Sequence, residues 1–246
     1  MPFSGKIYPL SEIKHNALDI IDSINEQSIH GETDYFIPLA KLTTALAQFF
    51  DICEKIESQP ELLNSDKSEF GSVSELGDYG LQLFSGLEQW VEAARLDRNG
   101  QLQISIISLA VWLHEHDGIL LQLESVVNAL SQIANQTSQP TALIKLHKIA
   151  EIITNSAHDM IKADIDKSEP GRAWRILNLN HGIIATRSHN IEIMNSVFEQ
   201  LIHRLPNDAP TFFAEGMKQM DIINYPEHVK HAIEHFYQLT NKPTLH

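Results

Sequence analysis

Apolar residues recur at spacings of three and four along most of the chain, and this period predicts amphipathic helices. Near the beginning, for example, Ile13, Ala17, Ile20 and Ile24 fall on one helical face. We find no runs of alternating apolar and polar residues between turns, the pattern typical of strands. The spacing predicts helices over residues 10–27, 38–57, 73–96, 101–116, 119–135, 141–166, 172–186, 191–205, 211–223 and 227–239, with two short helices broken near Asn155 and Ser156 as an alternative for the sixth. We therefore expect an all-α protein of roughly nine or ten helices.

The connections between the last four predicted helices are short, and short connections favour antiparallel neighbours. The seventh helix should therefore pair with the eighth, and the ninth with the tenth. Pairs of this kind stack on one another in helical-repeat proteins. We expect antiparallel helix pairs stacked as an α-α superhelix or a helical-repeat-like domain.

The two pairs recur at a regular spacing. Asn190 and Pro226, which precede the second helix of each pair, are 36 residues apart, near the period of tetratricopeptide-type repeats. Trp174 and Leu177 also lie three apart, as in the first helix of that repeat. Asn178 stands where the repeat has a small residue, and the second helix lacks the repeat's pattern of Ala and Phe. We interpret the spacing as helix-pair stacking in general.

Segment 172–186 has the pattern of a central helix. Large apolar side chains cover most of its circumference, which is typical of a helix packed on at least two sides. A narrow strip without them is formed by Arg175, Asn178, Gly182 and Thr186. We expect Arg175, Asn178 and Thr186 to lie on an exposed concave surface.

Another predicted helix, 73–96, contains Gly77, Gly80 and Gly86. Each glycine costs about 0.5–1 kcal/mol in a helix interior relative to alanine. Small residues at these positions allow a second helix to approach closely, so we expect a tight crossing or a bend here.

The length of 246 residues suits one large domain or two small ones. We expect a single all-α domain over residues 1–246. The longest polar stretch, 58–72, contains Pro60 and Gly71 and is the best candidate for a mobile loop or a subdomain boundary.

The formal net charge is −14, from 32 acidic and 18 basic side chains. This balance opposes binding to nucleic-acid phosphates or to an anionic membrane. The longest apolar run is too short to span a bilayer. Cys53 is the single cysteine, so an intramolecular disulfide is excluded and a reducing compartment fits. We therefore expect a soluble cytoplasmic protein that binds neither nucleic acid nor membrane.

A polar set on the central helix and its exit is the leading candidate for a binding site. In stacked helix pairs, Asn and Arg on a first helix often face a groove, where they hold a peptide carboxylate or backbone. The candidate residues are Arg175, Asn178, His181, Thr186, Arg187 and His189. The alternative is that Arg187 and the neighbouring Asn180 satisfy helix ends or a carboxylate in the core.

Histidine is frequent, with 13 residues, and the sharpest cluster lies on the last predicted helix. At about 100° per residue, His228, His231 and His235 share one stripe. His231 and His235 are four residues apart, the spacing at which two helical histidines can chelate zinc or another divalent metal. The alternative is a solvated face of His and Glu on an amphipathic helix.

Two His-Asp dipeptides, at 116–117 and 158–159, resemble the pair around which metal-dependent phosphohydrolases are built. For the second dipeptide, His114 or His147 could act as an upstream partner. Motifs for a nucleophile elbow or a glycine-rich phosphate loop are absent.

The sequence as a whole favours a non-catalytic module that binds a protein or peptide, or that assembles as a homo-oligomer. The rival hypothesis is a metal-binding protein or metal-dependent hydrolase that uses the clustered histidines.

Overall fold

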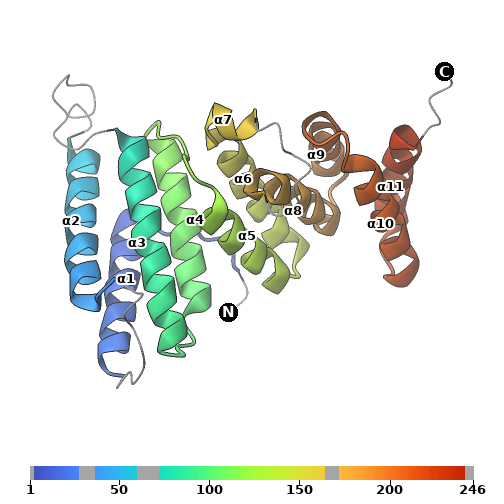
Figure 1. Cartoon of the computed structure of the whole chain (residues 1–246). Helices are drawn as coiled ribbons and strands as arrows, with labels where there is room; N and C mark the ends of the chain where they lie inside the picture. The colour runs from blue at the N-terminus through green and yellow to red at the C-terminus, as the bar shows by residue number, and fades with distance from the viewer. Residues whose placement is uncertain (1–2, 28–36, 60–71, 164–171, 242–246) are drawn as a thin grey trace. The chain divides into compact units, whose positions relative to one another are not determined.

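The computed structural model describes residues 3–27, 37–59, 72–163 and 172–241. In this part of the chain every regular element is a helix, eleven in all, and the strand-like pairing is limited to an isolated parallel bridge between Leu120 and Ala157 (Figure 1). The predicted all-α fold is confirmed. Residues 60–71, which make up most of the predicted loop or boundary at 58–72, lie outside the described residues.

Contacts within the chain group its residues into two compact units. Unit 1 comprises residues 6–133 and 155–159 together with Met1, and unit 2 comprises residues 2–5, 134–154 and 160–246. This division does not test whether the two units fold as one domain, so a single domain over residues 1–246 stays a prediction.

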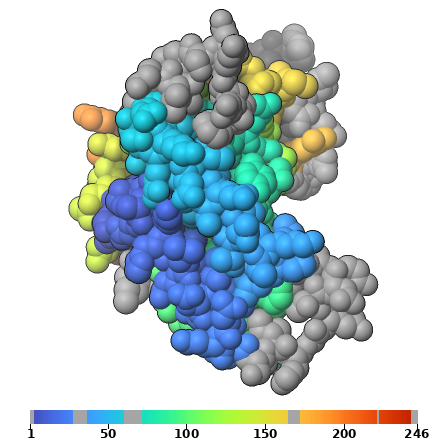
Figure 2. Space-filling model, turned by 90° about the vertical axis from the view of Figure 1, so that its left-hand side faces the viewer, coloured from blue at the N-terminus to red at the C-terminus, as the bar shows by residue number. Residues whose placement is uncertain are grey.

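Four long helices form the core of unit 1. They are α1 (Leu10–Asn25), α2 (Leu39–Ser58), α3 (Val73–Ala93) and α4 (Asn99–Glu115). Helix α1 packs against the other three, and α3 packs against α2 and α4. Figure 2 shows α1 and α2 side by side on one face of this unit. Apolar side chains that the periodicity placed on one face, among them Ile13, Ala17 and Ile20, are fully buried.

Helix α3 begins with a capping box and meets its neighbours at a glycine. The Ser72 hydroxyl accepts a hydrogen bond from the Glu75 backbone N–H, and the Glu75 carboxylate accepts one from the Ser72 N–H. A Cβ at Gly80 would lie 2.5 Å from Phe49 Cζ on α2 and 3.2 Å from Leu109 Cδ2 on α4. The predicted tight crossing is therefore confirmed at Gly80.

The chain continues through α5 (Glu124–Gln136), α6 (Pro140–Ser156) and α7 (Asp159–Lys162). Helix α5 begins five residues later than the predicted start at residue 119, because Leu120 is held in the isolated bridge instead. The Leu120 N–H donates to the Ser156 carbonyl at 2.7 Å, and its carbonyl accepts from the His158 N–H at 3.0 Å. The same bridge separates α6 from α7, so the predicted break near Ser156 is confirmed.

Two consecutive helical hairpins form the second half of unit 2. They consist of α8 (Ala173–Ser188) with α9 (Ile191–Arg204), and of α10 (Ala209–Ile222) with α11 (Glu227–Thr240). The two helices of each hairpin pack together, and α11 also packs against α9. The predicted pairing of the last four helices is confirmed.

The hairpins share one register. Asn190 and Pro226 are the N-cap residues of α9 and α11, and α8 and α10 begin at residues 173 and 209, so both pairs of positions differ by 36. Burial follows the same offset, since Leu177 corresponds to Phe213 and both are fully buried. The hairpins are therefore two copies of one local arrangement.

Helix α8 is buried on most sides, as its composition predicts. Trp174, Leu177, Ile184 and Ala185 are almost inaccessible, whereas Ile183 keeps 43% of its surface exposed. Among the described residues, no helix combines the length and the apolar character needed to cross a bilayer.

Candidate functional site

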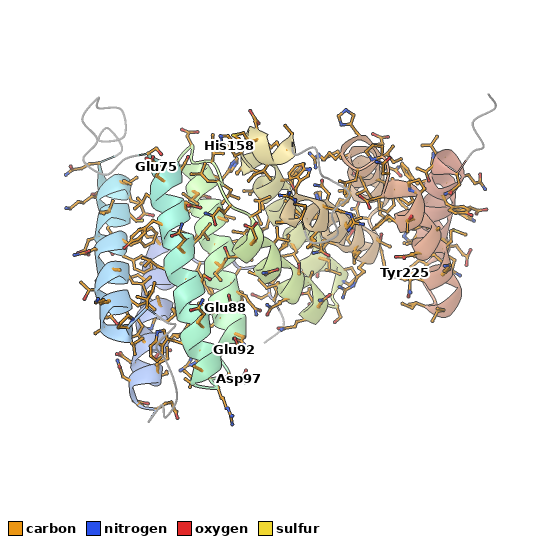
Figure 3. The ribbon with its side chains drawn as sticks, viewed as in Figure 1. Glu75, Glu88, Glu92, Asp97, His158 and Tyr225 are labelled. Carbon is orange, nitrogen blue, oxygen red and sulfur yellow. The ribbon has the colours of Figure 1, made fainter. Side chains whose placement is uncertain are left out.

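A groove in unit 2 runs between α8, α10 and α11 and has a cavity volume of about 310 Å³. We call it the α8/α10 groove. Its lining is mostly apolar and includes Ile183, Phe212, Met220, Ile223, Tyr225 and Ile233. Figure 3 labels Tyr225 in the connection between α10 and α11. Polar groups from Thr186, Arg187, Glu215 and Gln219 also line the groove.

Glycines allow the elements around this groove to approach closely. A Cβ at Gly182 on α8 would lie 2.7 Å from Phe212 Cζ, and one at Gly216 on α10 would lie 3.2 Å from Ile233 Cγ2. Phe212 can therefore lie directly against the backbone of α8. Ile183 and Ile223 remain 43% and 48% exposed, so the groove presents apolar surface to solvent.

Of the six predicted binding residues, only Thr186 and Arg187 line this groove, and Arg175, Asn178, His181 and His189 do not. Arg175 forms an ion pair with Asp208, in which its Nε and Nη2 donate to Oδ1 at 2.9 Å and 2.6 Å. Asn178 is 3% exposed; its Nδ2 donates to the Trp174 carbonyl at 2.8 Å and its Oδ1 accepts from Arg204 Nη1 at 3.2 Å. The expected exposed surface is therefore wrong for Arg175 and Asn178, because internal partners engage their polar groups.

Arg204 connects Asn178 to an aromatic side chain. Its guanidinium carbon lies 5.7 Å from the centroid of the Trp174 ring, within the range of a cation–π contact. Burial lowers the pKa of Arg204, and the carboxylate of Glu151 on α6 opposes this change. Arg204 thus stabilises the packing of α9 against α8.

The predicted residue His181 pairs with a second histidine. His181 Nε2 lies 2.8 Å from His147 Nδ1 on α6, and the two rings stack with centroids 5.0 Å apart. Burial, His147 and Arg204 lower the pKa of His181 to about 3. Burial also lowers the pKa of His147, with a smaller opposing effect from Glu151. Both rings are therefore neutral at pH 7, with the proton on one of the two facing nitrogens and the lone pair on the other.

Thr186 and Arg187 line the groove, but their polar groups have partners within the chain. The Thr186 hydroxyl donates to the Gly182 carbonyl at 2.9 Å, and Thr186 is only 8% exposed, so the expectation that Thr186 is exposed is also wrong. Arg187 donates through Nη1 and Nη2 to the carbonyls of Ala134 and Thr137. The Ala134 carbonyl lies in the last turn of α5 and that of Thr137 directly follows the helix, so Arg187 satisfies a helix end, as the alternative interpretation of its role predicts.

His189 lies beside the groove at the turn between α8 and α9. Its backbone is left-handed, with φ 57°, and its ring meets that of Tyr225 edge-on at 5.5 Å. His228 on α11 donates from Nε2 to the His189 carbonyl at 3.1 Å. Burial lowers the pKa of His189, and His228 contributes in the same direction.

The three predicted metal ligands on α11, His228, His231 and His235, do not converge on one metal position. Among the described residues, no group of three or more His, Cys, Asp and Glu side chains is placed to hold a metal ion. His231 and His235 are exposed, and His228 instead contacts the His189 carbonyl. Zinc or another divalent metal at His228, His231 and His235 stays a prediction without geometric support.

The His-Asp dipeptide at 116–117 and the nearby His114 have structural roles in unit 1. His116 stacks on Trp112 with centroids 4.3 Å apart, and its Nδ1 lies 2.8 Å from the Trp112 carbonyl. Asp117 has a positive φ of 57° at the end of α4. His114 Nδ1 lies 2.9 Å from the Ser156 hydroxyl. These contacts account for His114 and His116 as parts of helix ends and packing.

The sequence did not predict most of the groove lining, nor the internal contacts of the candidate binding residues. Phe212, Met220 and Ile233 have the spacing of ordinary core residues, and nothing local distinguishes a groove wall from a core. The 36-residue spacing was the signal that could have placed α10 beside α8. Comparison with protein-family models, with curated proteins and with solved structures gives no match for this chain.

Proposed function

We propose that the protein is a non-catalytic binding module whose α8/α10 groove takes a short apolar segment of a partner protein. The observation that carries the proposal is the exposed apolar surface of Ile183 and Ile223 within a groove of about 310 Å³. Exposed apolar surface in a concave site is typical of interaction sites. A groove between helices suits the apolar face of a partner helix or an extended peptide.

The distribution of polar groups supports binding in preference to catalysis. Arg175, Asn178, His181 and Arg187 are engaged in contacts within the chain, so the surface left to a ligand is mainly apolar. Glu215 and Gln219 on α10 offer the polar groups at which a peptide could be oriented. Their hydrogen bonds would add specificity to the apolar contact.

The proposal is tested with the full chain and random linear peptides displayed on phage. Selected peptides are synthesised, and their Kd is measured by fluorescence anisotropy for the wild-type protein and for Ile183→Asp. A carboxylate at position 183 places a charge in the apolar groove at an exposed position, so the fold should tolerate it. We expect affinity to fall by about tenfold or more, the effect of roughly 1.4 kcal/mol.

The matched control is Leu239→Asp on α11, which changes a side chain that is 50% exposed and does not line the groove. It should leave the Kd unchanged. An equal loss of peptide affinity in both variants would refute the groove as the binding site. So would a selection in which no peptide loses affinity for Ile183→Asp. Sedimentation tests self-assembly separately: an oligomer that Ile183→Asp dissociates and Leu239→Asp leaves intact would make a second copy of the chain the occupant.

A further inference from the structure

The net charge of the chain is confined to one of its two units. The residues of unit 1 include 7 Lys and Arg against 21 Asp and Glu, a formal charge of −14, whereas those of unit 2 include 11 of each sign. Unit 1 therefore carries the whole formal charge of the protein. Its electrostatic potential attracts cations and repels polyanions.

Unit 1 also contains a polar cavity of about 200 Å³, lined by α3, by the start of α5 and by Gln122, two residues before α5. We call it the α3/α5 cavity. Carboxylates from Asp78, Glu88 and Glu124 line it, and its described lining includes no Lys, Arg or His. Side-chain amides and hydroxyls form most of the remaining wall, and Leu81 adds an apolar contact. The cavity therefore offers many hydrogen-bond acceptors without a compensating cation.

Asp78 is the carboxylate of this cavity with one oxygen buried and unsatisfied. Its Oδ2 accepts hydrogen bonds from Gln82 Nε2 at 3.0 Å and from Gln122 Nε2 at 3.4 Å. Its Oδ1 is buried, and we find no hydrogen-bond partner for it among the described residues. A carboxylate oxygen withdrawn from water without a partner is costly. A cation in the cavity would reduce this cost by neutralising the carboxylate.

Glu88 adds a second unfavourable negative charge. Burial raises the pKa of Glu88, and the neighbouring carboxylate of Glu92 raises it further. Figure 3 shows Glu88 and Glu92 on the same stretch of α3. Both effects disfavour the ionised form of Glu88, and a cation nearby would oppose them.

We propose that the α3/α5 cavity takes the ammonium or guanidinium group of a Lys or Arg side chain from a basic segment of a partner protein. The charge of unit 1 steers such a segment toward the surface. The carboxylates and amide oxygens of the cavity then accept hydrogen bonds from the cationic group. Leu81 contacts the methylene stem of the incoming side chain, which is apolar.

The cavity suits an organic cation better than a metal ion. Within the described part of the chain, no three acidic or other metal-binding side chains lie close enough together to hold one ion. The cavity volume of about 200 Å³ is several times the ~30 Å³ that one water molecule occupies in the liquid. It therefore has room for a charged group together with part of its stem.

The test uses the full chain and an acetylated, amidated tetralysine peptide as the probe. Binding is followed at pH 7.5 by the backbone amide NMR signals of Asp78, Gln82 and Gln122. We expect the probe to shift these signals and Asp78→Asn/Glu88→Gln to weaken its Kd by about tenfold or more. The same peptide with all four lysines acetylated on Nζ should produce no shift, because it lacks the charge.

The control Asp22→Asn/Glu26→Gln removes two charges from exposed positions of unit 1 outside the cavity. It should change the Kd by less than about twofold at 0.15 M salt, where distant charges are screened. Equal weakening by both double variants would overturn the proposal, because binding would then depend only on net charge. Saturation of the same signals by spermidine or calcium well below the concentration needed for the peptide would also overturn it.

A third variant tests the cavity without removing its carboxylates. Gln82 is exposed and one helical turn after Asp78, so Gln82→Lys places an ammonium group beside that carboxylate. We expect this variant to fold and to lose the probe-induced shifts, whereas Gln27→Lys, with the same added charge just after α1, should retain them. Undiminished probe binding by Gln82→Lys would contradict the proposed site.

Discussion

The imidazole of His181 on α8 stacks on that of His147 on α6, with His181 Nε2 2.8 Å from His147 Nδ1. In this hydrogen bond one nitrogen carries the proton and the other supplies its lone pair. Protonation of both rings places a proton on each facing nitrogen and two positive charges side by side in a buried setting. Arg204 adds a third positive charge nearby. The pair therefore cannot hold two protonated rings, and the buried His181 is the ring held neutral.

We predict that unit 2 loses stability as the pH falls below 6.5. The folded-state pKa of His181 is lowered to about 3 from an ordinary value of 6.5. Below pH 6.5 the unfolded chain binds a proton that the folded chain does not, so unfolding is favoured increasingly until the pH approaches 3. Between pH 7 and pH 5 the loss from His181 alone should be about 2 kcal/mol. Urea denaturation at the two pH values measures it.

The variant His181→Gln removes the titrating group. Between pH 7 and pH 5 its free energy of unfolding should therefore fall by about 2 kcal/mol less than that of the wild type. The substitution also lowers stability at pH 7, and the test is therefore the difference between pH values within each variant. His235→Gln, at an exposed position of α11, should keep the wild-type pH dependence. A wild-type pH dependence in His181→Gln would show that the histidine pair does not control acid stability.

The glycines of α3 allow a prediction with an internal control. At Gly80 a methyl group would lie 2.5 Å from Phe49 Cζ, whereas at Gly86 the nearest atom, Leu42 Cδ1, is 3.5 Å away. Gly80→Ala should lower the free energy of unfolding by about 1–3 kcal/mol, because overpacking outweighs helix propensity. Gly86→Ala should raise it by up to about 1 kcal/mol, because the helix gains propensity without a clash.

Urea denaturation followed by circular dichroism distinguishes these outcomes. Stabilisation by Gly80→Ala would mean that α2 and α4 can move away from α3 at little cost. Destabilisation by Gly86→Ala would mean that the space beside Leu42 is filled in solution.

Local patterns predicted the helices because each helix is defined by the spacing of its own apolar residues. The close packing at Gly80 was also predictable, since a helix interior rarely contains glycine without a packing reason. The start of α5 was not, because Leu120 has helical spacing but pairs with Ser156 and His158. That pairing joins positions far apart in the sequence, and no local pattern contains it.

The candidate site was harder to predict for the same reason. The polar residues on α8 were expected to face a groove, but they have partners from α6, α9 and the start of α10. Arg175 is paired with Asp208 and His181 with His147. Once these contacts form, the polar strip no longer faces solvent. The surface left open is the apolar one around Ile183, which hydrophobic spacing alone would assign to the core.

The metal hypothesis gives a separate prediction. His231 and His235 supply only two neighbouring ligands on α11, and a structural zinc site usually has four. Without further ligands, zinc should bind weakly and leave the thermal midpoint of the untagged protein unchanged, because only tight binding to the folded state stabilises it. Elemental analysis and thermal denaturation with added zinc check this. A stoichiometric metal that His231→Gln/His235→Gln removes would make the metal-binding alternative the leading one.

The ion pair between Arg175 and Asp208 should couple the two hairpins of unit 2. Asp208 is the N-cap residue of α10, and Arg175 lies in the first turn of α8. The two side chains are only 21% and 16% exposed, and both hydrogen bonds are charge-assisted. Arg175→Met should therefore lower the free energy of unfolding by about 1–3 kcal/mol, because it leaves a partly buried carboxylate without its cation.

A double-mutant cycle with Asp208→Leu isolates the interaction itself. We expect a coupling energy of about 1–2 kcal/mol between Arg175 and Asp208, since they share two hydrogen bonds away from bulk water. The comparison pair is Glu227 with Lys230, an exposed ion pair within α11, whose coupling should stay below about 0.5 kcal/mol. Equal coupling in the two cycles would mean that solvent screens Arg175 and Asp208 as fully as a surface pair, and that apolar packing alone holds α8 to α10.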